Sequence, residues 1–306
     1  MQEFSEQQMQ EIQDYIELLK SEINRKLDEY TQFASGCPKS LVEPIRYSLL
    51  SSGKRIRPIM TLLACEVCGG VRSRAIPAAC AIEMVHSYSM IHDDLPAMDN
   101  DDLRRGQLTC HIQFDEACAI LAGDALLTYA FEVLARKIFP LDLAGECVGI
   151  LAEASGPMQL VGGQADDMGW SSSGNTSLEF LESIHKRKTG MLILAGLRMG
   201  AKIGGASVPQ WKKLEEYGNN YGLAFQITDD LLDWVGDEET TGKRVRKDKS
   251  QGKLTFPTYL GLEESKKQAQ ERVDAACSAL EGLQANNKLA YQALICLTTS
   301  LLARKK

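Results

Sequence analysis

The sequence is poor in several features that would assign it to a broad class of protein. It has no excess of positive charge: 34 Lys and Arg stand against 41 Asp and Glu, a net charge of −7, which argues against general nucleic-acid binding. No uninterrupted apolar run reaches the roughly 18 residues that would suggest a membrane span. The N-terminus from Met1 to Glu6 is acidic and polar, unlike a signal peptide. We therefore expect a cytoplasmic protein with no stable membrane anchor.

Signals for β-structure are also scarce, because alternating β-branched runs joined by Asn-Gly or Asp-Gly turns are absent. Apolar residues instead recur at three- and four-residue steps, which predicts α-helices. We expect helices over 12–27, 76–91, 115–138, 178–199, 211–235 and from 254 onward, and loops at 69–70, 170–175 and 204–207. The nine cysteines lie mostly in apolar, helix-like segments, which predicts buried reduced thiols. Residues 1–306 should form a single all-α domain.

The sequence does contain two clusters of aspartate. Asp93-Asp94-Leu95-Pro96-Ala97-Met98-Asp99 lies in the first third, and Asp229-Asp230-Leu231-Leu232-Asp233 lies well downstream. Two like charges about 4 Å apart repel by up to about 4 kcal/mol at an effective dielectric of about 20, so apolar surroundings call for a cation. Mg²⁺ prefers oxygen ligands and usually shares its shell between one or two carboxylates and substrate phosphates. The clusters predict a Mg²⁺-dependent site for a phosphorylated substrate, facing one cavity.

The second cluster fits a regular helix, because Asp229 and Asp233 are four residues apart and share a face. A solvated acidic face is the alternative interpretation. The apolar neighbours Phe225, Ile227 and Trp234 weigh against it, since they indicate a helix buried on most sides.

The first cluster is less regular, because the six residues from Asp93 to Asp99 turn an ideal helix by about 240°. Pro96 disfavours helix at the residue before it. We therefore expect the helix to loosen here and Asp99 to turn back toward Asp93.

Basic residues beside glycines complete the pattern. Gly53-Lys54-Arg55-Ile56-Arg57-Pro58 is a compact cationic turn, and Arg104-Arg105-Gly106 follows the first cluster. Lys188-Thr189-Gly190 lies mid-chain, and Gly242-Lys243 and Gly252-Lys253 flank a charged stretch. Arg binds phosphate bidentately and Lys binds it as a point charge. A lone basic run is usually solvated, but these turns combined with two acidic clusters predict a diphosphate site.

In this order, and with Phe225-Gln226 ahead of the second cluster, the motifs resemble those of the trans-isoprenyl diphosphate synthases. The resemblance covers most of the chain and is closest to the bacterial farnesyl diphosphate synthases, the geranyltranstransferases. It implies the isoprenoid synthase fold, a bundle of antiparallel α-helices around a deep central cavity, usually as a homodimer. It also implies the reaction. An allylic diphosphate held through several Mg²⁺ ions ionises, isopentenyl diphosphate attacks the carbocation, and a proton leaves.

The resemblance also assigns roles to single residues. The implied metal ligands are Asp93, Asp99 and Asp229 directly, with Asp94, Asp230 and Asp233 in support or bound through water. The allylic diphosphate would be held by Arg104, Lys188 and Lys243, beside Thr189 and Gln226. Isopentenyl diphosphate would be held by Lys54, Arg57, His86 and Arg105, with Lys253 at the lid of the site. The groups expected to act in catalysis are Asp93, Asp99, Arg104, Lys188, Asp229 and Lys243. Without the resemblance, His86 would be interpreted as a core histidine.

Product length depends on what lies beneath the first cluster. Tyr88 precedes Asp93 by five residues, about 7.5 Å along a helix. The resemblance to bacterial farnesyl diphosphate synthases includes this aromatic residue and the Asp-Asp-x₄-Asp spacing. We therefore expect a C15 product, with a C20 geranylgeranyl product as the alternative.

Three further interpretations stay open. A class I terpene cyclase would also use aspartate-rich helices, but it would leave the cationic turn at 53–58 unexplained. A non-catalytic regulatory subunit of a partner synthase should have lost carboxylates, whereas every motif here is intact. A helical metal-binding structural protein would have no use for the basic turns.

Overall fold

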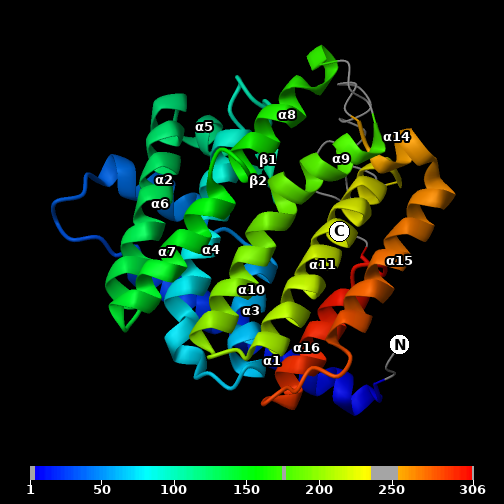
Figure 1. Cartoon of the computed structure of the whole chain (residues 1–306). Helices are drawn as coiled ribbons and strands as arrows, with labels where there is room; N and C mark the ends of the chain where they lie inside the picture. Colours follow the sequence, from blue (N-terminus) through cyan, green and yellow to red (C-terminus); the bar gives the residue numbers. More distant parts are fainter. Residues whose placement is uncertain (1–3, 174–176, 236–253, 305–306) are drawn as a thin grey trace.

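The computed structural model describes residues 4–173, 177–235 and 254–304, and almost every element in them is a helix. The all-α prediction is confirmed. Figure 1 shows the long helices standing side by side as a bundle. The helices of the first half are α1 (Glu6–Tyr30), α2 (Lys39–Leu49), α3 (Ile56–Val67), α4 (Arg72–Asp93), α5 (Cys110–Gln113), α6 (Glu116–Lys137) and α7 (Leu141–Ser155). Those of the second half are α8 (Leu160–Ser173), α9 (Leu178–His185), the π-helix η1 (Lys186–Gly190), α10 (Met191–Ile203), α11 (Val208–Val235), α14 (Phe256–Leu260), α15 (Leu262–Leu280) and α16 (Lys288–Thr299).

Local capping explains where several helices begin. The Ser5 hydroxyl accepts a hydrogen bond from the Gln8 backbone N–H, and the Gln8 side-chain oxygen accepts one from the Ser5 backbone N–H, which forms a capping box for α1. Asp115 accepts from the backbone N–H of Cys118 and caps α6, as its position before an apolar run predicts. After 254, Gly261 and Gly282 adopt positive φ angles of 82° and 69° at the ends of α14 and α15.

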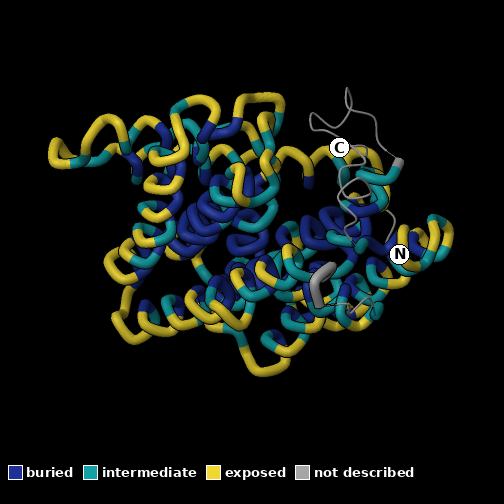
Figure 2. The backbone as a smooth tube through the Cα atoms, turned by 90° about the horizontal axis from the view of Figure 1, so that it is seen from above, coloured by how far each residue is buried: buried dark blue, intermediate teal, exposed yellow. Residues whose placement is uncertain are grey.

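The core lies between α3, α4, α6 and α10. Helix α4 packs against α6 and α3, and α10 packs against α3, α7 and α11. Figure 2 shows buried backbone in the interior of the molecule and exposed segments around it. All nine cysteines are free thiols, and six of them are buried, as predicted.

Three details differ from the sequence prediction. Residues 170–173 were expected in a loop but continue α8, because serine is only slightly poorer than alanine inside a helix. The helix expected over 178–199 is interrupted by the π-helix η1. A short hairpin, β1 (Leu103–Arg104) with β2 (Gln107–Leu108), was not expected. Its turn uses Arg105 and Gly106, both at positive φ, where an Asn-Gly pair is the usual signal.

One described helix, α6, is long and apolar enough to cross a membrane by length and composition alone. This is weak evidence, since core helices of other proteins meet the same criterion. Helix α6 packs against α4, α2 and α7.

Candidate active site

The first acidic cluster lies where α4 ends. The helix stops at Asp93, ahead of Pro96, and the chain folds back so that the backbone N–H of Asp99 donates to the Asp93 carbonyl at 2.8 Å. The backbone N–H of Asp101 likewise donates to the Asp94 carbonyl at 3.2 Å. The predicted break is confirmed, and it brings Asp99 back beside Asp93 instead of leaving it part of a turn away.

Asp93 is 7% exposed, and burial raises the pKa of its carboxyl to about 6. The Lys188 ammonium opposes this shift, and the negative charge of Asp99 adds to it. Ionisation of Asp93 is therefore energetically unfavourable unless more positive charge lies nearby.

Asp94 has a different environment. Arg104, on β1, donates from Nε to both carboxylate oxygens of Asp94 at 2.8 and 2.7 Å, and from Nη2 to one of them. Asp94 is 2% exposed and Arg104 is also largely buried. This fork-to-fork pair fastens the hairpin to the end of α4. The family resemblance implied that Asp94 supports metal binding and that Arg104 holds the allylic diphosphate. The structure pairs these two side chains with each other.

The second cluster lies near the end of α11, which carries Asp229, Asp230 and Asp233 as one helical run. Asp230 is 5% exposed and accepts from Gln226 Nε2 and from the backbone N–H of Phe256, each at 3.0 Å. His185 Nε2 lies 3.3 Å from Oδ2, the same carboxylate oxygen that accepts from Phe256. Asp230 therefore holds α9, α11 and α14 together. His185 and Phe256 carried no sequence signal, because their contacts are long-range.

Lys188 and Thr189 lie in η1, between α9 and α10. Lys188 Nζ donates to Asp167 of α8 at 2.7 Å, and Thr189 Oγ1 donates to Gln226 Oε1 at 2.9 Å. Helix α8 comes so close that a Cβ at Gly163 would lie 2.6 Å from the Lys188 backbone nitrogen. Lys188 also lies close enough to the first cluster for its positive charge to lower the pKa of Asp93.

The cationic turn at 53–58 is anchored by Arg55. This residue adopts a left-handed conformation with φ 52°, and its guanidinium forms an ion pair with Glu83 of α4 at 2.5 Å, both side chains being 2% exposed. It also donates to Asn24 Oδ1 and to the Leu49 and Ser51 carbonyls. Arg55 is thus committed to contacts within the protein. Burial lowers the pKa of Lys54 and of Arg57.

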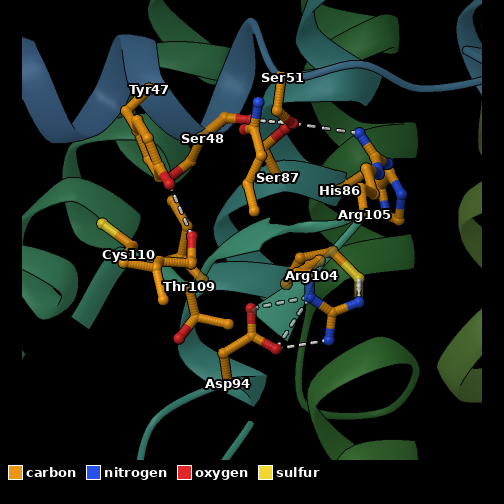
Figure 3. A pocket seen from close by; sticks show the side chains of 14 residues that line it. Tyr47, Ser48, Ser51, His86, Ser87, Asp94, Arg104, Arg105, Thr109 and Cys110 are labelled. Atoms are coloured by element: carbon orange, nitrogen blue, oxygen red, sulfur yellow. Dashed lines mark hydrogen bonds and ion pairs between the residues drawn. The ribbon is translucent and has the colours of Figure 1, made fainter. Parts of the chain in front are cut away.

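His86, Arg104 and Arg105 meet at a small cavity between α2, α4 and the hairpin. Figure 3 shows Arg104 bound to Asp94 and Arg105 reaching Ser51. Burial and then the charges of Arg57, Arg105 and Arg104 lower the pKa of His86 well below its usual value. The lowered pKa keeps the imidazole neutral at physiological pH, and a neutral ring can donate a hydrogen bond to an anion.

Tyr88 is 6% exposed on α4 and packs edge-on against His92, with ring centroids 5.6 Å apart. His92 Nε2 lies 3.0 Å from the Ile120 carbonyl of α6. A Cβ at Gly123 would lie 2.1 Å from this nitrogen, so the glycine makes room for the ring. The Tyr88 ring therefore packs against a His92 ring that is itself held in place by α6. Sequence reasoning did not identify His92 or Gly123.

The described residues contain no group of three His, Cys, Asp or Glu side chains already gathered as a metal site. Mg²⁺ usually takes one or two protein carboxylates and completes its shell with water and substrate phosphates. The costly charge on Asp93 beside Asp99 suits a hard cation. Lys243 and Lys253 lie outside the described residues.

The arrangement places carboxylates and cations at one end of a helical bundle, with an aromatic residue one and a half turns beneath Asp93. Such a site can hold a diphosphate through cations and leave its apolar tail pointing along α4 toward Tyr88.

Comparison with known proteins agrees with this geometry. Residues 38–294 match the sequence model of the family described as Polyprenyl synthetase. A geranylgeranyl diphosphate synthase from Cyanophora paradoxa is 48% identical over 243 residues, which cover 79% of this chain and 81% of that protein. A farnesyl diphosphate synthase from Geobacillus stearothermophilus is 43% identical over 269 residues, covering 87% of this chain and 90% of that protein. Among solved structures, a geranyltransferase from Helicobacter pylori, complexed with magnesium and isoprenyl diphosphate, has a TM-score of 0.85 at 31% identity and covers 99% of this chain and 100% of its own.

Proposed function

Because the chain belongs to the polyprenyl synthetase family and is a trans-prenyltransferase, we propose that it makes (2E,6E)-farnesyl diphosphate from isopentenyl diphosphate and dimethylallyl or geranyl diphosphate. The single observation that supports the C15 product is the supported Tyr88 ring beneath Asp93. The reaction is proposed to need Mg²⁺, with several ions in each site.

Asp93, Asp99 and Asp229 would hold the metal ions, with Asp233 in support. Asp94 and Asp230 would keep their protein partners and fix the ends of α4 and α11. Bound Mg²⁺ supplies Lewis-acid stabilisation of the departing diphosphate. Lys188 and Arg104 would add positive charge where negative charge develops. Lys54, Arg57, Arg105 and neutral His86 would hold isopentenyl diphosphate.

The allylic C–O bond breaks and its electron pair leaves with diphosphate. The double bond of isopentenyl diphosphate attacks the allylic carbon, and the resulting cation loses a proton. We propose that the released diphosphate removes this proton, since no titratable side chain is indicated by the sequence as the base. Apolar walls shield the cation from water.

A C20 product is the second candidate. It is favoured by the relative from Cyanophora paradoxa, which is named a geranylgeranyl diphosphate synthase. The two candidates differ in how far the tail can grow past Tyr88, not in the chemistry at the diphosphate.

A homodimer is proposed from the outer face of α6. Ile120 and Leu121 on this helix are 44% and 57% exposed, and Ile112 on the neighbouring α5 is 45% exposed. Neighbouring exposed apolar side chains of this size are typical of an interface. We also propose that residues 1–306 form one domain and that the protein acts in the cytoplasm.

The test is turnover by the purified protein with Mg²⁺, isopentenyl diphosphate and geranyl diphosphate. Diphosphate release that needs both substrates, and that stops on chelation of the metal, supports the proposal. Turnover only with an added partner chain would support a regulatory subunit. Cyclic hydrocarbon formed from farnesyl diphosphate alone would support a terpene cyclase.

A further inference from the structure

The end of the bundle opposite the acidic clusters has a surface of its own. Helices α4 and α11 begin at this end, and each carries its acidic cluster about 32 Å farther along the helix. The turns between α3 and α4, between α6 and α7, and between α10 and α11 lie there together (Figure 1).

These three turns contact one another. A Cβ at Gly70 would lie 2.6 Å from the Cα of Gly204, so the α3–α4 and α10–α11 turns are in direct contact. Arg74 Nη2 donates to the Phe139 carbonyl at 3.2 Å, which joins the α6–α7 turn to the start of α4. We call the resulting continuous surface the basal surface, and it consists of residues 68–75, 136–143 and 201–213.

Large apolar side chains project from the basal surface into solvent. Among the described residues, four of the five most exposed large apolar side chains lie on it: Val71 at 64%, Phe139 at 63%, Leu141 at 71% and Val208 at 70%. Trp211 in the first turn of α11 is partly exposed, with the Lys202 ammonium 5.9 Å from its ring centroid. Neighbouring exposed apolar side chains mark an interaction surface, and tryptophan is typical of the headgroup level of a bilayer.

The basal surface is basic although the whole chain is acidic. Its three segments contain seven Lys and Arg residues and one acidic residue, Asp142, a net charge of +6 in a chain whose net charge is −7. Three of these cations pair with carboxylates outside the segments: Arg72 with Glu22, Arg136 with Glu132 and Lys202 with Glu146. The other four form no ion pair within the described part of the chain, and they are Arg74, Lys137, Lys212 and Lys213.

The neighbouring turn between α15 and α16 does not cancel this charge. Lys213 Nζ donates to the Glu281 carbonyl, which places that turn beside the basal surface. Residues 281–288 carry one charge of each sign, Glu281 and Lys288, so they leave the balance unchanged. The end of the bundle therefore combines exposed apolar side chains with an excess of positive charge.

We propose that the basal surface docks the enzyme reversibly on a lipid bilayer that contains anionic headgroups. The four apolar side chains enter the headgroup region, and the four cations without an ion pair face lipid phosphates. A second copy of the chain fits this surface less well, because a two-fold interface would set the same cations against each other. Docking at this end leaves the diphosphate site open to water on the far side. The inference holds for a C15 and for a C20 product alike.

Flotation of the full chain with lipid vesicles measures the binding. Vesicles of phosphatidylcholine alone are compared with mixed vesicles of phosphatidylcholine and phosphatidylglycerol. We expect binding to the mixed vesicles to be at least about tenfold tighter and to weaken as salt is added, because salt screens the attraction to anionic headgroups. Lys137→Gln combined with Lys212→Gln should weaken this binding and make it less sensitive to salt.

Val71→Asp combined with Leu141→Glu tests the apolar contact without disturbing the fold. Val71 is the N-cap of α4 and Leu141 begins α7, where Asp and Glu respectively are favoured. Affinity for the mixed vesicles should fall by at least about tenfold, since two buried apolar side chains are replaced by charges that anionic lipids repel. Circular dichroism and turnover without vesicles should match those of the unmodified protein.

Met158→Glu is the matched control. Met158 is the fifth of these most exposed side chains, at 76%, and it lies beyond the far end of α7 from Leu141. It should bind the mixed vesicles as tightly as the unmodified protein.

Two results would overturn the inference. One is no binding of the unmodified protein to the mixed vesicles, and the other is undiminished binding by the folded Val71→Asp, Leu141→Glu protein. If vesicle binding is absent and this double variant also has a lower mass by analytical ultracentrifugation, a second copy of the chain covers the basal surface instead.

Discussion

At the scale of single residues, the carboxylates of each acidic cluster divide between two tasks. Asp94 and Asp230 are buried and fully engaged with protein donors, so they maintain the geometry. Asp93 carries a destabilised charge that a metal ion would relieve. The sequence predicted both clusters as metal ligands but could not separate these tasks, because Arg104 and Phe256 reach the carboxylates through the tertiary fold.

The raised pKa of Asp93 gives a prediction for stability. Its pKa is about 6 in the folded protein and about 3.9 in an unfolded chain, so ionisation penalises the folded state as the pH rises through 6. With metal chelated, Asp93→Asn should raise the free energy of unfolding at pH 8 by up to about 3 kcal/mol. This gain should shrink as the pH falls below 6 and vanish below about pH 4.

Urea unfolding at pH 8 and pH 4.5 with a chelator measures this effect. Asp274→Asn, at an exposed position of α15, is the control and should change little at either pH. A metal-free Asp93→Asn protein less stable than the unmodified chain at pH 8 would show that Asp93 is not under electrostatic strain.

At the scale of elements, the sequence predicted most helices and the break ahead of Pro96. These signals are local: apolar spacing, the Asp115 cap and the proline ring. The π-helix η1 was not predicted, because its wider turn lies against α8, a segment distant in the sequence. Nothing in Lys186–Gly190 alone signals a wider turn.

Gly163 should be essential for that contact. Gly163→Ala would place a Cβ 2.6 Å from the Lys188 backbone nitrogen and 3.0 Å from its Cα, so η1 must shift. We expect kcat to fall by at least about tenfold, since displacement of a positioning group by about 1 Å can cost about a hundredfold. Steady-state kinetics at saturating substrates measures this. Gly145→Ala on α7 has open space around its Cβ and should keep full activity. Equal activity of the two variants would contradict the positioning role of this contact.

At the scale of the whole molecule, α6 has two faces. Its inner face packs on α4 beneath Tyr88, and its outer face exposes Ile120 and Leu121. Its apolar composition on both sides follows if a second copy covers the outer face. The sequence alone indicated a dimer only through resemblance.

Leu121→Glu should therefore convert a dimer to monomers, because it would place two charges in an apolar interface. Analytical ultracentrifugation at micromolar concentration measures the mass. Leu18→Glu is the control, since Leu18 is 55% exposed on α1, and it should leave the mass unchanged. A Leu121→Glu protein that sediments as a dimer would exclude this face as the interface.

The most direct test of the account is the chain length of the product made by the unmodified protein and by Tyr88→Ala, resolved by chromatography after removal of the diphosphate. The account predicts a C15 alcohol from the unmodified protein and a shift to C20 or longer from Tyr88→Ala, because the supported ring would no longer stop the growing tail. A C20 product from the unmodified protein, or an unchanged C15 product from the variant, would contradict it.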